Sequence, residues 1–173
     1  MKASYLVRGF PGHPLHPPLT DATIGAYTAA TVFAVLAAAG VSEENTTKAW
    51  WLALLVGLAA TVPTALTGLV DWLGISRGTP LRRTATLHLL AMLAATGLFA
   101  LTAAYGHDRY VMGEMTTRAL VGTLLGFGFL TLGGWLGGSV VYVHGMRVLD
   151  LASEPTRRAT TPGHPEKDLA EGS

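Results

Sequence analysis

Hydrophobic positions along the chain gather in four long runs that are separated by short polar segments. The runs span residues 19–40, 50–73, 84–105 and 119–143, and ionisable residues are rare within them. A helix needs roughly 20 apolar residues to cross the hydrocarbon core of a bilayer. The pattern therefore predicts an all-α integral membrane protein, a four-helix antiparallel transmembrane bundle with short loops.

The two ends of the chain lack such runs. Residues 1–18 contain four prolines and no apolar stretch, which predicts a Pro/His-rich lead-in and not a secretory signal peptide. Residues 19–148 form the predicted four-span domain. Residues 149–173 are rich in Glu, Arg, Thr and Pro, and because this composition cannot bury a core they are expected to form a disordered tail in which His164 has no role.

Composition narrows the class of protein further. Only 13% of the residues are charged, about half the fraction typical of soluble domains, so much of the surface is expected to face the lipid bilayer. The absence of cysteine excludes a disulfide scaffold and thiolate sites for zinc or iron–sulfur clusters. A net charge of +1 argues against nucleic acid as a partner.

The distribution of Lys and Arg predicts the orientation in the membrane. Nine of the 12 lie before the first span, between the second and third spans, or after the fourth, and three lie in the other two loops. Positive loops stay in the cytoplasm. We therefore expect a multi-pass protein of the cell (inner) membrane with both termini cytoplasmic.

Antiparallel connection places ionisable residues from all four spans near this cytoplasmic side. They are Asp21 at the start of the first span, Asp71 at the end of the second, His88 at the start of the third and His144 at the end of the fourth. Polar groups at this depth usually face the bundle interior or water. A purely structural role stays open for each of them, as an interfacial acid or a hydrogen-bonded histidine.

Glycines mark the face of the fourth span that leads to His144. Steps of three and four residues back from His144 meet Gly137, Gly133, Gly126 and Gly122. Such stripes are typical of close helix packing or of a homodimer contact. Alternatively, the missing side chains leave room for a flat cofactor, and His88 and His144 are then candidate axial ligands of haem b, or ligands of another metal.

The run Gly-His-Pro-Leu-His-Pro-Pro at residues 12–18 is the most distinctive local sequence. Its prolines disfavour helix and favour polyproline II. We expect a stiff segment that crosses the cytoplasmic mouth and brings His16 toward the other ionisable residues. His16, Asp21 and Asp71 would then orient the imidazoles or receive a proton. The alternative is a stiff lead-in whose histidines lie on the surface.

Residues 12–17, 66–72, 83–88 and 142–146 together resemble the bacterial four-span membrane family catalogued as domain of unknown function twenty-two thirty-one. The resemblance covers about residues 9–148. Some relatives are joined to Rieske iron–sulfur domains, which implies a redox setting. Because this chain has no cysteine for such a cluster, its electron partner would be a separate redox protein.

These observations predict a membrane protein with a cytoplasmic-side haem or metal site that takes part in electron transfer. The sequence carries no catalytic signature. Two alternatives stay open: a non-catalytic membrane scaffold held by a polar network, and a small transporter subunit.

Overall fold

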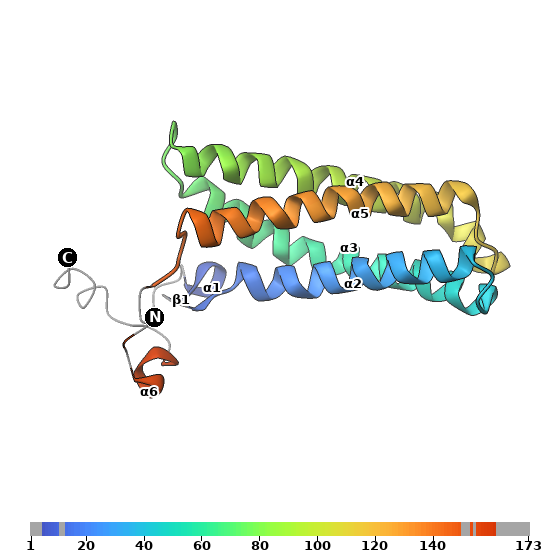
Figure 1. The fold of residues 1–173 in the computed structure, drawn as a ribbon, viewed down its shortest axis with the longest axis horizontal. Helices are drawn as coiled ribbons and strands as arrows, with labels where there is room; N and C mark the ends of the chain where they lie inside the picture. Colours follow the sequence, from blue (N-terminus) through green and yellow to red (C-terminus); the bar gives the residue numbers. More distant parts are fainter. Residues whose placement is uncertain (1–4, 11–12, 150–152, 154, 162–173) are drawn as a thin grey trace.

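A computed structural model describes residues 5–10, 13–149, 153 and 155–161 (Figure 1). Four long helices run side by side: α2 (His16–Ala38), α3 (Glu43–Leu73), α4 (Pro80–Met112) and α5 (Thr117–Gly138). Within the described residues, these four helices, the last extended to Val143, are long and apolar enough to cross a membrane. The predicted all-α four-helix membrane bundle is confirmed.

Shorter elements lie around the four helices: α1 (Tyr5–Arg8), β1 (Gly9–Phe10), β2 (His13–Pro14), the π-helix η1 (Ser139–Val143) and α6 (Thr156–Ala159). Strands β1 and β2 pair antiparallel just before α2. The predicted disordered tail lies largely outside the described residues, as does His164, and its described part includes the single turn α6.

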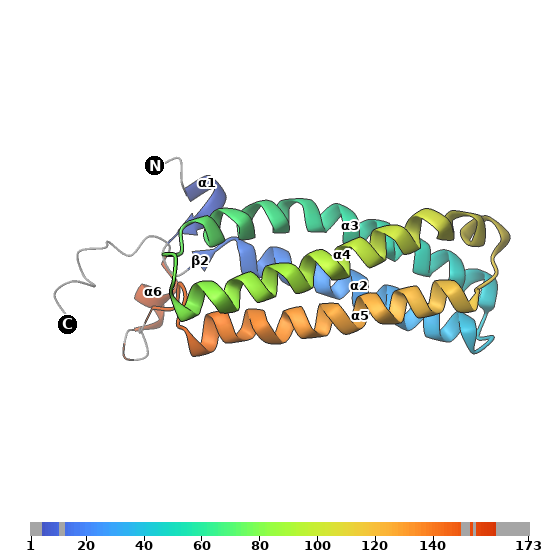
Figure 2. The same cartoon turned by 90° about the horizontal axis from the view of Figure 1, so that it is seen from above.

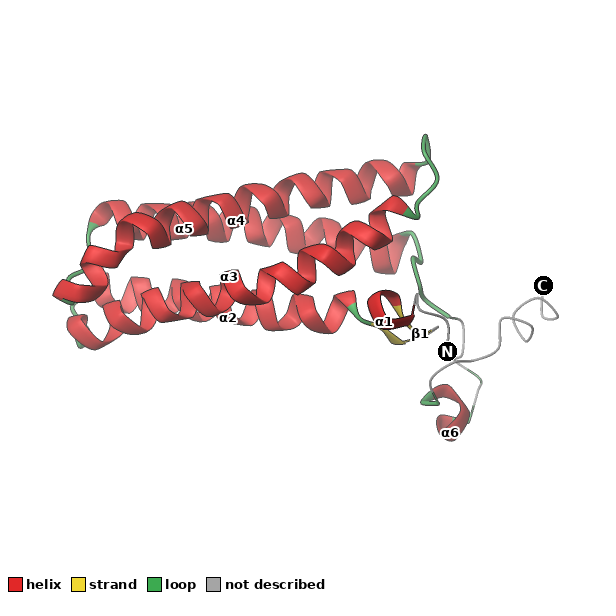
Figure 3. Cartoon of the chain, turned by 180° about the vertical axis from the view of Figure 1, so that it is seen from behind, coloured by secondary structure: helices red, strands yellow, loops and turns green. Residues whose placement is uncertain are grey.

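The bundle consists of two antiparallel helical hairpins, α2–α3 and α4–α5, which Figures 2 and 3 show from two further sides. Helix α3 also packs against α4, and α2 against α5, so α2 and α4 lie diagonally across the bundle. One end carries residues 5–10 and 13–15, the loop 74–79 and residues 144–149. We call it the terminal end, and the opposite end the far end.

Each observed helix begins two to seven residues before its predicted span, and side-chain capping sets the start of α4 and α5. Thr79 and Thr116 cap α4 and α5, their hydroxyls accepting from the backbone N–H groups of Arg82 and Ala119. The polyproline II prediction is wrong at His16, where α2 begins with Pro17 and Pro18 in its first turn. Proline is tolerated there because the first N–H groups of a helix have no intrahelical partner.

Large rings fill the interior of the bundle and lie against glycines. Tyr27 of α2 and Phe99 of α4 are fully buried and stack with ring centroids 4.1 Å apart. Trp50 is also fully buried, and its Nε1 donates to Thr123 Oγ1 at 2.9 Å. Apolar side chains cover the outside, for example Val56 at 60% exposure and Leu101 at 63%. The outer surface therefore suits lipid.

Candidate functional site at the terminal end

His88 lies in the third turn of α4 and points into the bundle. Its Nδ1 is 2.7 Å from the carbonyl oxygen of Gly133 in α5. A carbonyl can only accept, so Nδ1 carries the proton and, in the neutral ring, the lone pair lies on Nε2. A Cβ on Gly137 would lie 3.0 Å from His88 Cε1; the ring therefore occupies the space that this glycine leaves.

His16, in helix α2 diagonally across the bundle from α4, has the same arrangement. Its Nδ1 is 3.0 Å from the carbonyl oxygen of Thr64 in α3 and 3.3 Å from Thr67 Oγ1. Its ring lies against Gly68, where a Cβ would be 2.6 Å from His16 Cε1. Because Thr64 O can only accept, this imidazole also donates from Nδ1 and keeps its lone pair on Nε2.

The two rings are neighbours inside the bundle. Their centroids are 6.5 Å apart and their planes are inclined by 82°. Both side chains are half-buried. The structure thus brings His16 to His88, as the sequence predicted, although it does so through the first turn of a helix and not through an extended segment.

His144 lies nearer the terminal end. Its Nε2 is 3.0 Å from the hydroxyl of Thr84, which precedes His88 by one helical turn, about 6 Å of rise. The π-helix Ser139–Val143 lies between Gly138 and His144 and adds an extra residue to the turn. The extra residue moves His144 away from the position that a continuous α-helix would give it. The prediction that His144 and His88 lie at equal depth assumed a continuous α-helix.

The glycine stripe of α5 is filled by side chains of α4. The atoms nearest a Cβ built on Gly122, Gly126, Gly133 and Gly137 belong respectively to Thr102, Phe99, Met92 and His88. Close helix packing therefore explains the stripe. The alternative expectation, that it leaves a gap for a flat cofactor, is wrong for these four positions.

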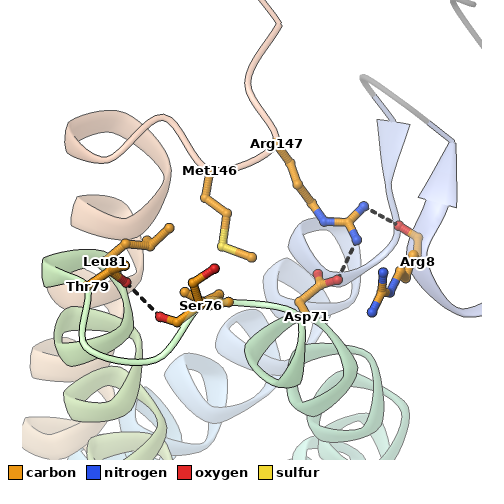
Figure 4. Close-up of a pocket in the computed structure, with 9 residues that line it drawn as sticks. Arg8, Asp71, Ser76, Thr79, Leu81, Met146 and Arg147 are labelled. Atoms are coloured by element: carbon orange, nitrogen blue, oxygen red, sulfur yellow. Dashed lines mark hydrogen bonds and ion pairs between the residues drawn. The ribbon is translucent and has the colours of Figure 1, made fainter. Parts of the chain in front are cut away.

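Asp71 contacts an arginine and not a histidine. Arg147 donates to Asp71 Oδ1 at 2.6 Å and to the carbonyl oxygen of Arg8 at 3.1 Å (Figure 4). The Asp71 side chain is only 10% exposed. Asp21 is exposed and makes no hydrogen bond or ion pair within the described residues.

The Asp71–Arg147 pair borders a hollow of about 550 Å³ at the terminal end, drawn in Figure 4. The hollow lies between the end of α3, the start of α4 and the segment after η1, and its lining includes Arg8, Ile75, Ser76, Thr79 and Met146.

Sequence reasoning missed Arg147 as the partner of Asp71, Thr84 as that of His144 and the Thr64 carbonyl as that of His16. For His88 it allowed a backbone carbonyl among other partners but could not say which one. Side-chain spacing cannot reveal a backbone acceptor on another helix. Within the described residues, no group of three or more His, Cys, Asp or Glu side chains is arranged to hold a metal ion.

Four lipid-facing helices with a polar cluster at one end define an integral membrane protein. The family model described as "Predicted membrane protein (DUF2231)" matches residues 12–150, and the chain belongs to this family. No curated protein and no solved structure matches the chain.

Proposed function

We propose that this protein holds a metal-containing cofactor, haem b or a single ion, at the terminal end of its bundle and serves in electron transfer. The observation that carries the proposal is the His88 imidazole, held by a backbone carbonyl at 2.7 Å with its Nε2 lone pair free and a second imidazole 6.5 Å away. Metal-bound histidines commonly donate their other nitrogen to a carbonyl in this way.

The second ligand comes from His144, as the sequence predicts, or from His16. Neutral imidazoles suit iron, copper and zinc, so the donor chemistry suits either kind of cofactor. A single ion needs no further space, whereas haem needs the α4 side chains on the glycine stripe to move aside. His144 Nε2 lies beside a hydroxyl, which leaves Nδ1 for coordination. In His16, as in His88, Nε2 is the available atom.

The distribution of Lys and Arg supports an orientation in the inner membrane in which the terminal end faces the cytoplasm. An electron-transfer role then needs a separate redox protein on that side. The terminal end exposes arginines, among them Arg77 and Arg83, that suit an acidic partner.

Purified protein tests the proposal directly. We expect a Soret band if haem is bound, or a stoichiometric metal by elemental analysis if a single ion is bound, and His88→Ala should remove either one. His107→Ala, at the far end with an exposed side chain, is the matched control and should leave the cofactor in place.

A second candidate function is a non-catalytic scaffold, and the paired contacts favour it. Asp71 is satisfied by Arg147 and His144 by Thr84, so these groups tie helix ends together without any ligand. In that case wild-type protein stays colourless and metal-free even after expression with a haem precursor. His88→Ala would then lower the melting temperature and change nothing else.

A further inference from the structure

The two helical hairpins repeat one another in their packing. Tyr27 lies against Gly57 in the first hairpin, and Phe99 lies against Gly126 in the second. His16 lies against Gly68, and His88 against Gly137. Residues of α2 precede their α4 equivalents by 72 positions in both cases, and residues of α3 precede their α5 equivalents by 69.

The hydrogen bonds of the two imidazoles follow the same sequence offset between the hairpins. His16 Nδ1 is bound by the carbonyl of Thr64 and His88 Nδ1 by the carbonyl of Gly133, two residues that are also 69 positions apart. In each hairpin this carbonyl belongs to the residue four positions before the glycine under the imidazole.

Burial follows the repeat as well. Shifting the buried residues of α2 by 72 positions reaches buried residues of α4 at five places. These pairs are Thr23 and Ala95, Tyr27 and Phe99, Ala30 and Thr102, Thr31 and Ala103, and Ala34 and Gly106. Since α2 and α4 run in the same direction, the two hairpins are related by an approximate two-fold axis along the bundle, and Tyr27 and Phe99 stack across that axis.

We propose that His16 and His88 bind one metal centre on this approximate two-fold axis, each through Nε2, in trans positions. The inference deepens the proposed function, on which it rests, by naming the second ligand. Metal–imidazole bonds are about 2 Å long, which places the ring centroids of two trans ligands about 6 Å apart. The observed centroid separation of 6.5 Å is close to that value.

His144 does not fit the repeat. Its equivalent position in the first hairpin is Ile75, so no second imidazole is related to it by the two-fold relation. Its ring lies a turn nearer the terminal end, beside Thr84. His144 thus positions the end of α5 against α4 and is not a ligand.

A centre held by two imidazoles is a lone two-coordinate ion such as Cu(I), or haem iron if the α4 side chains that fill the glycine stripe of α5 move aside. Both offer the same chemistry to two imidazoles, and two titrations separate them. Haemin added to the cofactor-free protein in detergent micelles reports by its Soret band and spin state. Cu(I) added against a competing chelator reports by the affinity constant.

We expect one equivalent of haemin or of Cu(I) to bind wild-type protein. His16→Gln and His88→Gln should each weaken binding about 100-fold or more, because one ligand of two is lost, and a haem complex should change from low to high spin. Circular dichroism of each variant checks that the helices of the bundle are retained. His13→Gln, exposed and three positions before His16, and His144→Gln should bind within a fewfold of wild type.

Each remaining outcome decides a different point. If His144→Gln loses the ligand and His16→Gln retains it, the proposed function stands and the two-fold site is wrong. If wild-type protein binds neither haemin nor Cu(I), both proposals fail. If all four variants weaken binding equally while circular dichroism shows the helices intact, binding is nonspecific and the assignment of His16 and His88 is overturned.

Discussion

Arg147 reaches back across 76 positions to Asp71 and donates to its carboxylate at 2.6 Å. The contact fastens the segment after the last span to the end of the second span. Arg147 also donates to the carbonyl of Arg8, so one guanidinium joins three parts of the terminal end. The side chain of Asp71 is 10% exposed and that of Arg147 28%, so this pair is less accessible to solvent than a surface ion pair.

Asp71→Asn should therefore destabilise the bundle by about 1–3 kcal/mol, since it leaves a half-buried guanidinium without its anion. Thermal unfolding in detergent, followed by circular dichroism, measures the loss. The control is Glu44→Gln, which removes the exposed partner of Lys48 at the far end and should leave the melting temperature unchanged. Equal melting temperatures for both variants would contradict the structural role of the pair.

The orientation of the bundle can be measured with reporters. An enzyme active only in the cytoplasm, fused after Ser173, should be active, and a reporter active only after export, inserted near Glu44, should also be active. The physical reason is the excess of Lys and Arg on the side of the termini. Activity in the reverse pattern would place the histidine cluster on the other side of the membrane.

Gly57→Ala should destabilise the interior by about 1–3 kcal/mol. A Cβ at this position would lie 2.5 Å from Tyr27 Cε1, and Tyr27 cannot retreat because it stacks on Phe99 and its hydroxyl bonds Thr61. Gly134→Ala is the control, since nothing lies within 4 Å of a Cβ built there. Comparable unfolding of the two variants would show that helix propensity and not the ring contact decides the effect.

The hydrogen bond from Trp50 to Thr123 links α3 to α5 inside the bundle. Thr123→Val keeps the shape of the side chain and removes the acceptor, so the indole N–H loses its partner. We expect a loss of about 0.5–2 kcal/mol. Thr131→Val, whose exposed hydroxyl donates only to Phe127 O in its own helix, should change stability by much less in the same unfolding assay.

The spans and their number followed from the sequence because transfer of apolar residues into lipid depends on composition and length alone. The convergence of His16 with His88 was also predictable, since antiparallel spans return to the same side. The hydrogen-bond partners of these histidines were not predictable. The carbonyls of Thr64 and Gly133 become acceptors only when two helices pack at one particular rotation, and the π-turn before His144 changes that rotation without a sequence motif to mark it.

The repeat of the two helical hairpins was not visible in the sequence for a related reason. Equivalent positions share burial and mostly differ in identity, for example tyrosine with phenylalanine and alanine with threonine. The identical positions, such as His16 with His88 and Gly68 with Gly137, are too sparse to show a repeat by inspection. Contacts to glycine reveal it because they depend on geometry.

The repeated frame gives the two imidazoles equal positions and unequal chemistry. His16 has the Thr67 hydroxyl 3.3 Å from its Nδ1, whereas the residue equivalent to Thr67 beside His88 is Leu136. Beyond them, Asp71 on one side corresponds to Val140 on the other. A repeated frame of this kind separates placement from environment: the shared contacts to glycine and to a backbone carbonyl set where the two rings lie, whereas the side chains around each ring differ.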